Sequence, residues 1–276
     1  MTPDVSQLPS LIRLLEDDSD LVRTEVTAAL QQYGDQLNWL VDTLDPPVTD
    51  LDRTRLETIV LPGPGWLKHR WAALEDTPLT WDSLELRLGL LSRYIRGHGS
   101  VDDVTTSLDD ITLDFQDSGP HKDVFDLGKF FYFYLGLAGN RHEYYDPENC
   151  DLYSVMMNGV GTSLSLSLVF LLASYRMRFH TEGCNHPSGF MVKAWHDDRL
   201  YLVDAFNYWT FFSERDIAGM DPDHSERLLA SASTPCDLRD MLALFLENLA
   251  SSYRFTNQPD RAALIESLPL PATTPA

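Results

Sequence analysis

The sequence predicts an α+β protein, in which helices come first, one long buried helix follows, and strands come after it. Residues 8–136 hold segments in which apolar residues recur every three or four positions, the period of an amphipathic helix. Residues 159–179 become apolar on all sides, so other elements must cover them. Residues 189–195 and 199–207 predict the two strands of a β-hairpin. This order is typical of the α+β class, with the buried helix lying against a small antiparallel sheet.

The N-terminal part of the chain predicts two pairs of helices. In residues 8–33 the apolar side chains form two stripes, and Asp18 or Ser19 is expected to be the N-cap between them. A second pair is expected in residues 36–44 and 50–61, on either side of a proline pair. The first pair resembles a HEAT-type helical hairpin, a unit that needs stacked neighbours to bury its core. The two stripes consist of Leu11, Leu14 and Leu15, and of Val22, Val26, Ala29 and Leu30.

More helices are expected after a loop rich in Pro and Gly at residues 61–66. Ser100 is expected to cap the third of them. Residues 141–161 then predict a long polar loop around a short helix. The helices predicted before that loop span residues 66–75, 83–95, 100–115 and 121–136.

Residues 159–179 carry two conflicting signals. The first half alternates Ser and Leu with the period of a strand, whereas the second half is continuously apolar, as in a buried helix. We predict a helix throughout. The small side chains of Ser165 and Ser167 can bond back to preceding carbonyl groups and let neighbouring elements approach closely.

The end of the chain is expected to be helical again, in residues 213–220, 237–255 and 260–268. The last two helices resemble one tetratricopeptide-type hairpin, and residues 269–276 are expected to be disordered. The predicted units are a helical HEAT-like region at 1–62, a domain at 63–235 whose helical part is 63–136, and a helical hairpin with its tail at 236–276.

Composition narrows the class of protein. The chain of 276 residues is 43% hydrophobic, which is enough for a sizeable core, and its formal net charge is −21. Such acidity argues against nucleic acids and anionic membranes as partners, because binding phosphate groups requires concentrated positive charge. The three cysteines, Cys150, Cys184 and Cys236, indicate reduced thiols. Without a visible signal peptide or an apolar run long enough to span a bilayer, a cytoplasmic location is expected.

Four short motifs occur in an order that resembles the transglutaminase-like superfamily, and more narrowly its SirB-type bacterial branch. In that branch a helical region precedes a papain-like domain, and tetratricopeptide repeats commonly follow. The resemblance is closest over residues 140–207, and it implies a papain-like fold. The motifs are Tyr145-Asp146-Pro147-Glu148-Asn149-Cys150, Gly161 before Ser165-Leu166-Ser167, Pro187-Ser188-Gly189-Phe190, and Asp204-Ala205-Phe206-Asn207.

The resemblance also implies a site, in which a Cys at the start of the central helix is activated by a His on one strand, and an Asp on the next strand orients that His. Here Ser163 stands at the nucleophile position, Gly189 at the base position and Asp204 at the position of the acid. A serine hydroxyl is too basic to ionise without an adjacent base, and glycine has no side chain to act as one. A two-residue turn at Asp197-Asp198 would nevertheless turn Gly189 and Asp204 to the same side. We therefore expect Ser163 to cap the helix, Asp204 to anchor a turn, and no acyl chemistry.

Other constellations remain open. Cys184 could be a relocated nucleophile beside His186, although an offset of three residues from Gly189 would turn His186 to the opposite face of a strand. Cys184 is otherwise expected to be a buried apolar residue. A metal site made by His180, Cys184, His186 and His196 is disfavoured, because their spacing matches no common zinc pattern.

The loop before the buried helix is expected to border the cleft. Asp146-Pro147 predicts a turn, and Asn149 is expected to bond local backbone groups. Residues expected to line the cleft are Tyr145, Asp146, Asn149 and Asn207.

These patterns lead to two alternative functions. One is a catalytically degenerate module for protein interaction or regulation, and the other is a hydrolase or acyl transferase with a shifted Ser/Cys–His–Asp constellation. A third hypothesis is that a small molecule binds in the cleft beside Gly189, where the side chain of the base is missing. No cofactor or metal is expected, the partner is an unidentified protein, and the sequence does not indicate an oligomeric state.

Overall fold

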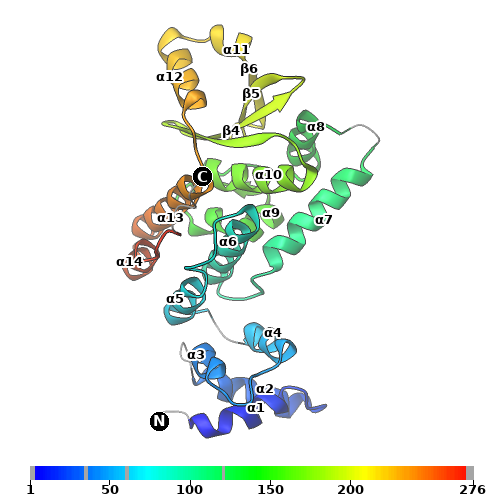
Figure 1. The fold of residues 1–276 in the computed structure, drawn as a ribbon, viewed down its shortest axis with the longest axis vertical. Helices are drawn as coiled ribbons and strands as arrows, with labels where there is room; N and C mark the ends of the chain where they lie inside the picture. The colour runs from blue at the N-terminus through cyan, green and yellow to red at the C-terminus, as the bar shows by residue number, and fades with distance from the viewer. Residues whose placement is uncertain (1–3, 34–36, 60–61, 120–121, 272–276) are drawn as a thin grey trace.

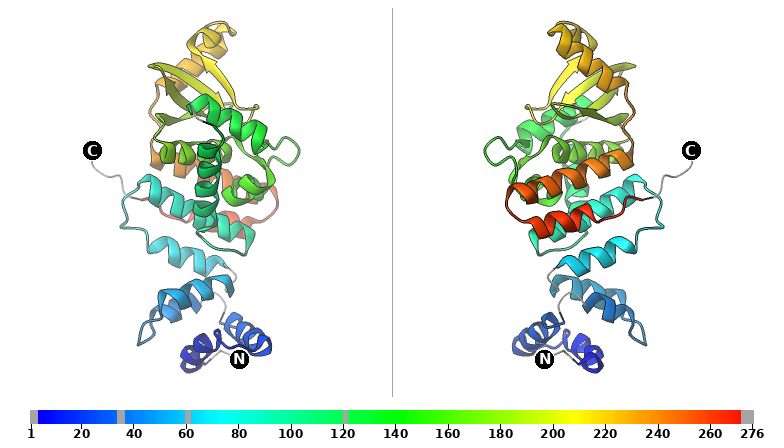
Figure 2. Two further views of the ribbon diagram at one scale, coloured as in Figure 1. Left: turned by 90° about the vertical axis from the view of Figure 1, so that its right-hand side faces the viewer. Right: turned by 90° about the vertical axis from the view of Figure 1, so that its left-hand side faces the viewer.

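The computed structural model describes residues 4–33, 37–59, 62–119 and 122–271. Figures 1 and 2 show an elongated molecule with its N-terminal helices at one end and a small sheet near the other. The N-terminal helices pack around a hydrophobic cluster of their own, which includes Leu8, Leu30 and Leu56. The two predicted helix pairs are confirmed there as α1 (Leu8–Leu14), α2 (Asp20–Gln31), α3 (Leu37–Asp42) and α4 (Asp50–Ile59), with a 3₁₀ turn, η1 (Val5–Gln7), before them.

The helices after residue 63 contribute many of the buried side chains of the main hydrophobic core. They are α5 (Pro64–Ala72), α6 (Trp81–Arg96), α7 (Asp103–Asp117) and α8 (Val124–Lys129), and a π-helical turn, η3 (Phe130–Tyr134), follows α8. The helix α5 begins inside the predicted loop, because Pro64 suits the first helical turn, where no N–H partner is needed. The predicted cap of α7 at Ser100 is wrong, since Asp102 occupies the cap position. Residue 121, where another helix was expected to begin, lies outside the described residues.

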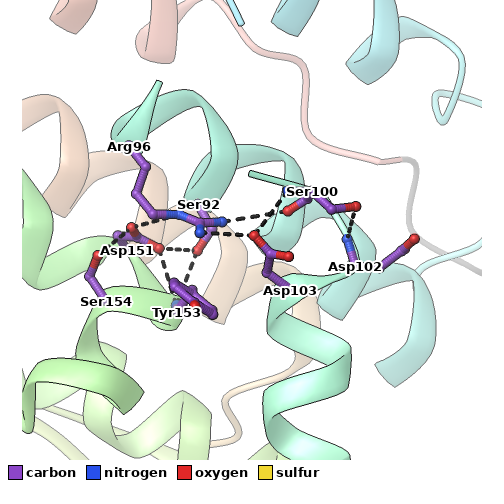
Figure 3. Close-up of polar contacts among 8 residues, drawn as sticks. All are labelled: Ser92, Arg96, Ser100, Asp102, Asp103, Asp151, Tyr153 and Ser154. Atoms are coloured by element: carbon purple, nitrogen blue, oxygen red, sulfur yellow. Dashed lines mark hydrogen bonds and ion pairs between the residues drawn. The ribbon is translucent and has the colours of Figure 1, made fainter. Parts of the chain in front are cut away.

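A buried carboxylate ties α6 and α7 to the segment that precedes the central helix. Asp151 is fully buried and accepts hydrogen bonds from the hydroxyl groups of Ser92 and Ser154, the latter at 2.6 Å. The guanidinium of Arg96 lies 3.2 Å from Asp151 and 2.9 Å from Asp103, as Figure 3 shows. This network holds the 3₁₀ turn η4 (Pro147–Cys150) and the helix α9 (Leu152–Asn158) against the helical layer.

The central helix is α10 (Ser163–Met177), which confirms that the serine-rich segment is helical despite its alternation. Thr162 caps it, and the Thr162 and Ser165 side chains bond reciprocally to each other's backbone N–H groups in a capping box. The helix ends at Arg178, which has a left-handed backbone with a φ of 58°. Its apolar side chains are buried almost all round, as predicted, because the helix lies between the sheet, α7 and α9.

The sheet is antiparallel, and in the described part of the chain its order is β3-β4-β5-β6. The predicted hairpin is confirmed, since His196 pairs with Arg199 and the turn residues Asp197 and Asp198 both have positive φ. The sequence patterns did not predict β6. The strands are β3 (Thr181–His186), β4 (Gly189–His196), β5 (Arg199–Asp204) and β6 (Thr210–Ser213), and a short parallel pair, β1 (Ala138–Gly139) and β2 (Val160–Gly161), lies before α10.

The two faces of this sheet are covered by different elements. Phe190 and Val192 belong to the main core with α10, whereas Met191 and Leu202 face a smaller cluster with Ile217. That second face is covered by α11 (Glu214–Ala218) and α12 (Pro222–Ser233), which lie at the top of Figure 1. The sequence patterns did not predict α12.

The predicted C-terminal helices are α13 (Leu238–Phe255) and α14 (Pro259–Glu266), which pack against each other. Buried residues of α13 such as Phe245 belong to the same core as α6 and α10. The Trp71 indole donates to the carbonyl group of Pro269 at 2.9 Å, so the chain after α14 returns to α5. Residues 272–276, part of the tail that was expected to be disordered, lie outside the described residues. In the described part of the chain, no helix combines the length and the apolar character needed to cross a bilayer.

Candidate functional site

A small cavity lies where the N-terminus of α10 meets the start of β4. Its volume is about 180 Å³. The structure brings Ser163, Gly189 and Asp204, the three positions that the resemblance identified, to the wall of this one cavity. The full lining consists of Tyr144, Ser163, Ser188, Gly189, Phe190, Met191, Asp204, Phe206 and Asn207.

Ser163 is the first residue of α10. Its predicted role as helix cap is wrong, because Thr162 provides the capping oxygen from one position earlier. The Ser163 hydroxyl instead accepts a hydrogen bond from the backbone N–H of Phe190, with an N···O distance of 3.2 Å. Among the described residues this hydroxyl has no acceptor for its own proton, which leaves it a free donor at the cavity wall.

Gly189 faces Ser163 directly. A Cβ atom at position 189 would lie 3.3 Å from Ser163 Oγ and 3.5 Å from Ser163 Cβ. The φ of Gly189 is +147°, which L-residues rarely adopt, so a side chain here would be strained as well as close. Position 189 therefore contributes backbone and open space to the cavity.

Asp204 ends β5 and holds the turn that follows it, as predicted. Its two carboxylate oxygens accept hydrogen bonds from the backbone N–H of Asn207 at 3.0 Å and from the Asn207 side-chain amide at 2.7 Å. The Arg141 guanidinium donates in turn to the Asn207 amide oxygen and lies over the Phe206 ring, 5.4 Å from its centroid. The acid of the cavity is thus anchored by an amide, and among the described residues no hydrogen bond joins it to an imidazole.

His186 lies close to the cavity but is engaged elsewhere. It pairs with Gly189 across the β3–β4 turn, and its ring lies 5.9 Å from the ring of His224 on α12. Its Nδ1 accepts from the backbone N–H of Ser188 at 3.2 Å and lies 2.7 Å from the Ser188 hydroxyl. Its Nε2 is buried without a partner among the described residues. Burial lowers the pKa of His186, and the neighbouring His224 and Arg227 add to this effect while the Asp204 carboxylate opposes it; the net shift is downward, which favours a neutral ring near pH 7.

The side chain of Cys184 lies away from the cavity. It is fully buried between the sheet and α12, in the cluster with Met191 and Leu202, as expected for a buried apolar residue. Burial raises the pKa of its thiol to about 11, although nearby Lys193 opposes the shift. Cys184 is therefore a protonated thiol at neutral pH and a weak nucleophile.

The other proposed metal ligands are dispersed. His180 stacks on Trp195 with ring centroids 4.1 Å apart, and His196 packs edge-on against Phe125. In the residues that the structure describes, no group of three His, Cys, Asp or Glu side chains could hold a metal ion.

The loop at residues 141–150 places Tyr144 at the cavity, whereas Tyr145, which was expected there, stacks on Phe255 with ring centroids 4.0 Å apart. Asn149 bonds local backbone as predicted, because its amide donates to the carbonyl groups of Glu143 at 2.6 Å and Tyr144 at 3.1 Å.

Of the four residues expected to line the cleft, Asn207 lies at the cavity, whereas Tyr145, Asp146 and Asn149 are not in its lining, and Asp146 instead caps η4. The expected lining omitted Tyr144, Ser188, Phe190, Met191 and Phe206. Ser188, Phe190 and Phe206 lie within the motifs, whereas nothing in a pair of adjacent tyrosines says which one faces inward.

Comparison with known proteins agrees with this architecture. Residues 102–247 match the family described as the transglutaminase-like superfamily. Over 145 residues the chain is 31% identical to a "UPF0162 protein" of Xylella fastidiosa (strain 9a5c), which covers 50% of this chain and 51% of the relative. A "UPF0162 protein" of Vibrio cholerae is 24% identical over 139 residues, 46% of this chain and 50% of the relative.

The chain thus spans about half the length of the curated relatives it matches, and their name states no activity. No solved structure matches it significantly. Because the family match covers more than half of the 276 residues and includes the central helix, the sheet and the cavity between them, the chain belongs to the transglutaminase-like superfamily.

Proposed function

We propose that this protein is a catalytically degenerate member of the superfamily, of the SirB-type branch, which acts in the cytoplasm as a protein-interaction or regulatory module. One observation carries the proposal: the residue that faces Ser163 is a glycine, so the place where a side chain would begin 3.3 Å from Ser163 Oγ holds no base. A serine hydroxyl without an adjacent base is a poor nucleophile near neutral pH. The Ser163 oxygen, moreover, already accepts a hydrogen bond from Phe190.

A role in binding other proteins is supported by the surface. Large aromatic side chains cluster on the surface, where Tyr132 contacts both Phe133 and Tyr208. Phe133 is 79% exposed and Tyr208 is 56% exposed, so most of each side chain lies in solvent. Clustered exposed aromatic groups mark interaction surfaces more often than isolated ones do. The HEAT-like region at 1–62 and the tetratricopeptide-like hairpin at 236–276 belong to the same proposal, as units that bind a protein partner.

The proposal is tested with activity probes on the native full-length chain. A fluorophosphonate probe for serine nucleophiles and an acyloxymethyl ketone probe for thiol nucleophiles should label neither Ser163 nor Cys184. Ser163→Ala and Cys184→Ala serve as matched controls. Labelling that is lost in either variant, but kept in the other, would overturn the proposal.

One contact favours a second candidate, a hydrolase. The Ser188 hydroxyl lies 2.7 Å from Nδ1 of the neutral His186, and Ser188 also lines the cavity. This is the distance at which a histidine activates a serine. Against it, among the described residues no carboxylate bonds to Nε2 of His186, so nothing orients the base from its far side. Probe labelling that is lost in Ser188→Ala and in His186→Gln, but kept in Ser163→Ala, would establish this candidate in place of the first.

A further inference from the structure

We propose that the cavity beside Gly189 binds an imidazole ring, supplied by a free small molecule or by a histidine side chain of a partner protein. The inference rests on the proposed loss of catalysis, since a side chain at position 189 would begin 3.3 Å from Ser163 Oγ and take up space in the cavity. It names the chemical class of ligand that the cavity would bind.

The size of the cavity suits a single ring. Its volume is about 180 Å³, and a protein cavity of about 150 Å³ is enough to hold benzene. Tyr144 and Phe206 stand at 70° to each other with centroids 6.0 Å apart, so two flat aromatic walls form a corner at the cavity. A flat five-membered ring can pack against such walls.

The polar groups of the wall require one donor and one acceptor from the ligand. The Ser163 hydroxyl has a proton to give and no acceptor for it among the described residues. Each Asp204 oxygen takes one bond from Asn207 and keeps a further lone pair. Neutral imidazole offers one ring nitrogen as acceptor and one ring N–H as donor, on opposite sides of a five-membered ring.

Other ligand classes fit less well. An anion would meet the Asp204 carboxylate in a protein of net charge −21. An alkylammonium group could bond to Asp204, but it has no acceptor for the Ser163 proton. The chain's own His186 cannot fill the space, because its ring is held by Ser188 and packs against His224.

The test is a titration of the ¹⁵N-labelled full-length chain with imidazole at pH 8, followed by NMR. We expect saturable shifts of the backbone amides of Ser163, Gly189 and Phe190, with a dissociation constant of about 1 mM for so small a ligand. N-methylimidazole, which lacks the N–H donor, should bind about 10-fold more weakly. Asp204→Asn should weaken imidazole by a similar factor of about 10. Absence of saturable shifts, or equal affinity for the two ligands, overturns the inference.

Two further variants keep the result interpretable. Gly189→Trp should abolish the shifts by filling the cavity. Because the backbone of that variant is also strained at a φ of +147°, Ser163→Ala provides a second and milder test, which should weaken imidazole binding without filling the cavity. Asp198→Asn is the matched control, since Asp198 is exposed in the hairpin turn and asparagine tolerates its positive φ. Weakening in Asp198→Asn equal to that in Asp204→Asn would mean that charge alone, and not the cavity, attracts the ring.

A second arm distinguishes the source of the ring. N-acetyl-histidine methylamide and a short histidine peptide are compared with the same peptide carrying alanine. Tighter binding of the histidine peptide than of imidazole assigns the site to a partner protein, and binding of imidazole alone assigns it to a small molecule. The readouts also separate the two proposals: probe labelling of Ser163 without imidazole defeats the proposed function, whereas an unlabelled chain with no saturable shift defeats only this inference.

Discussion

Two carboxylates of this protein, Asp151 and Asp204, occupy opposite kinds of environment. Asp151 is fully buried, accepts hydrogen bonds from two hydroxyl groups and a backbone N–H, and forms an ion pair with the Arg96 guanidinium. Asp204 is partly exposed, is bonded by Asn207 and opens onto a cavity. A fully satisfied polar group holds elements together, whereas one with spare capacity can recognise a ligand. The comparison separates the structural polar groups of this fold from those available for function.

The largest effect is expected at the buried carboxylate. Asp151→Ala should lower the free energy of unfolding by about 3–5 kcal/mol, because it removes the buried carboxylate that Ser92 and Ser154 bond to and leaves the Arg96 charge with Asp103 alone. Urea denaturation followed by circular dichroism measures this change. Asp204→Ala is the matched control and should cost less than about 1 kcal/mol. Similar losses in the two variants would remove the distinction between the two sites.

The hydroxyl groups of Thr162 and Ser163 at the start of α10 show the same contrast between a structural polar group and one that faces the cavity, with smaller expected effects. Thr162→Ala should destabilise the protein by about 1 kcal/mol, since it removes the side chain that caps the helix. Ser163→Ala should cost less than about 0.5 kcal/mol, because water in the open cavity can replace its bond to the Phe190 N–H. Thermal unfolding of the two variants ranks them, and a greater loss in Ser163→Ala would show that Ser163 is structural.

The buried imidazole predicts a pH dependence. The pKa of His186 lies below its ordinary value of 6.5 in the folded protein, so the unfolded chain binds a proton that the folded chain resists. Stability should therefore fall as the pH drops through and below about 6.5. His186→Gln should make the denaturation midpoint less sensitive to pH over this window. An unchanged pH profile would mean that His186 is accessible to protons in the folded state.

The smallest effect is expected inside α10. Ser167 Oγ is buried, and within the described residues it has no hydrogen-bond partner, contrary to the predicted bond to a preceding carbonyl group. Ser167→Ala should therefore be neutral or stabilise the protein by up to about 1 kcal/mol. Ser165→Ala, which removes the acceptor of the Thr162 backbone N–H in the capping box, should instead destabilise it by about 1 kcal/mol. Calorimetric midpoints of the two variants provide the comparison.

Much of the site could be located in the sequence, but its chemistry could not be assigned there. The four motifs placed Ser163, Gly189 and Asp204 at one site, and the structure lines a single cavity with them. The sequence indicated that His186 would turn away from Gly189, but its contact with His224 could not be predicted, because α12 lies more than 30 residues later and has no distinctive signal. Which of Tyr144 and Tyr145 faces the cavity could not be predicted either, because Tyr145 stacks on Phe255 at the C-terminal end of α13.

The sequence by itself determined the elements whose causes are local. Continuous apolar character is enough for α10, and a two-residue Asp-Asp turn is enough for the register of the β4–β5 hairpin. Only the tertiary structure decided which hydroxyl caps α10 and which one faces the cavity, and that His186 bonds to Ser188 and leaves Ser163 without a base. These choices depend on contacts between residues far apart in the chain, where packing and burial select one orientation among several that local preferences allow.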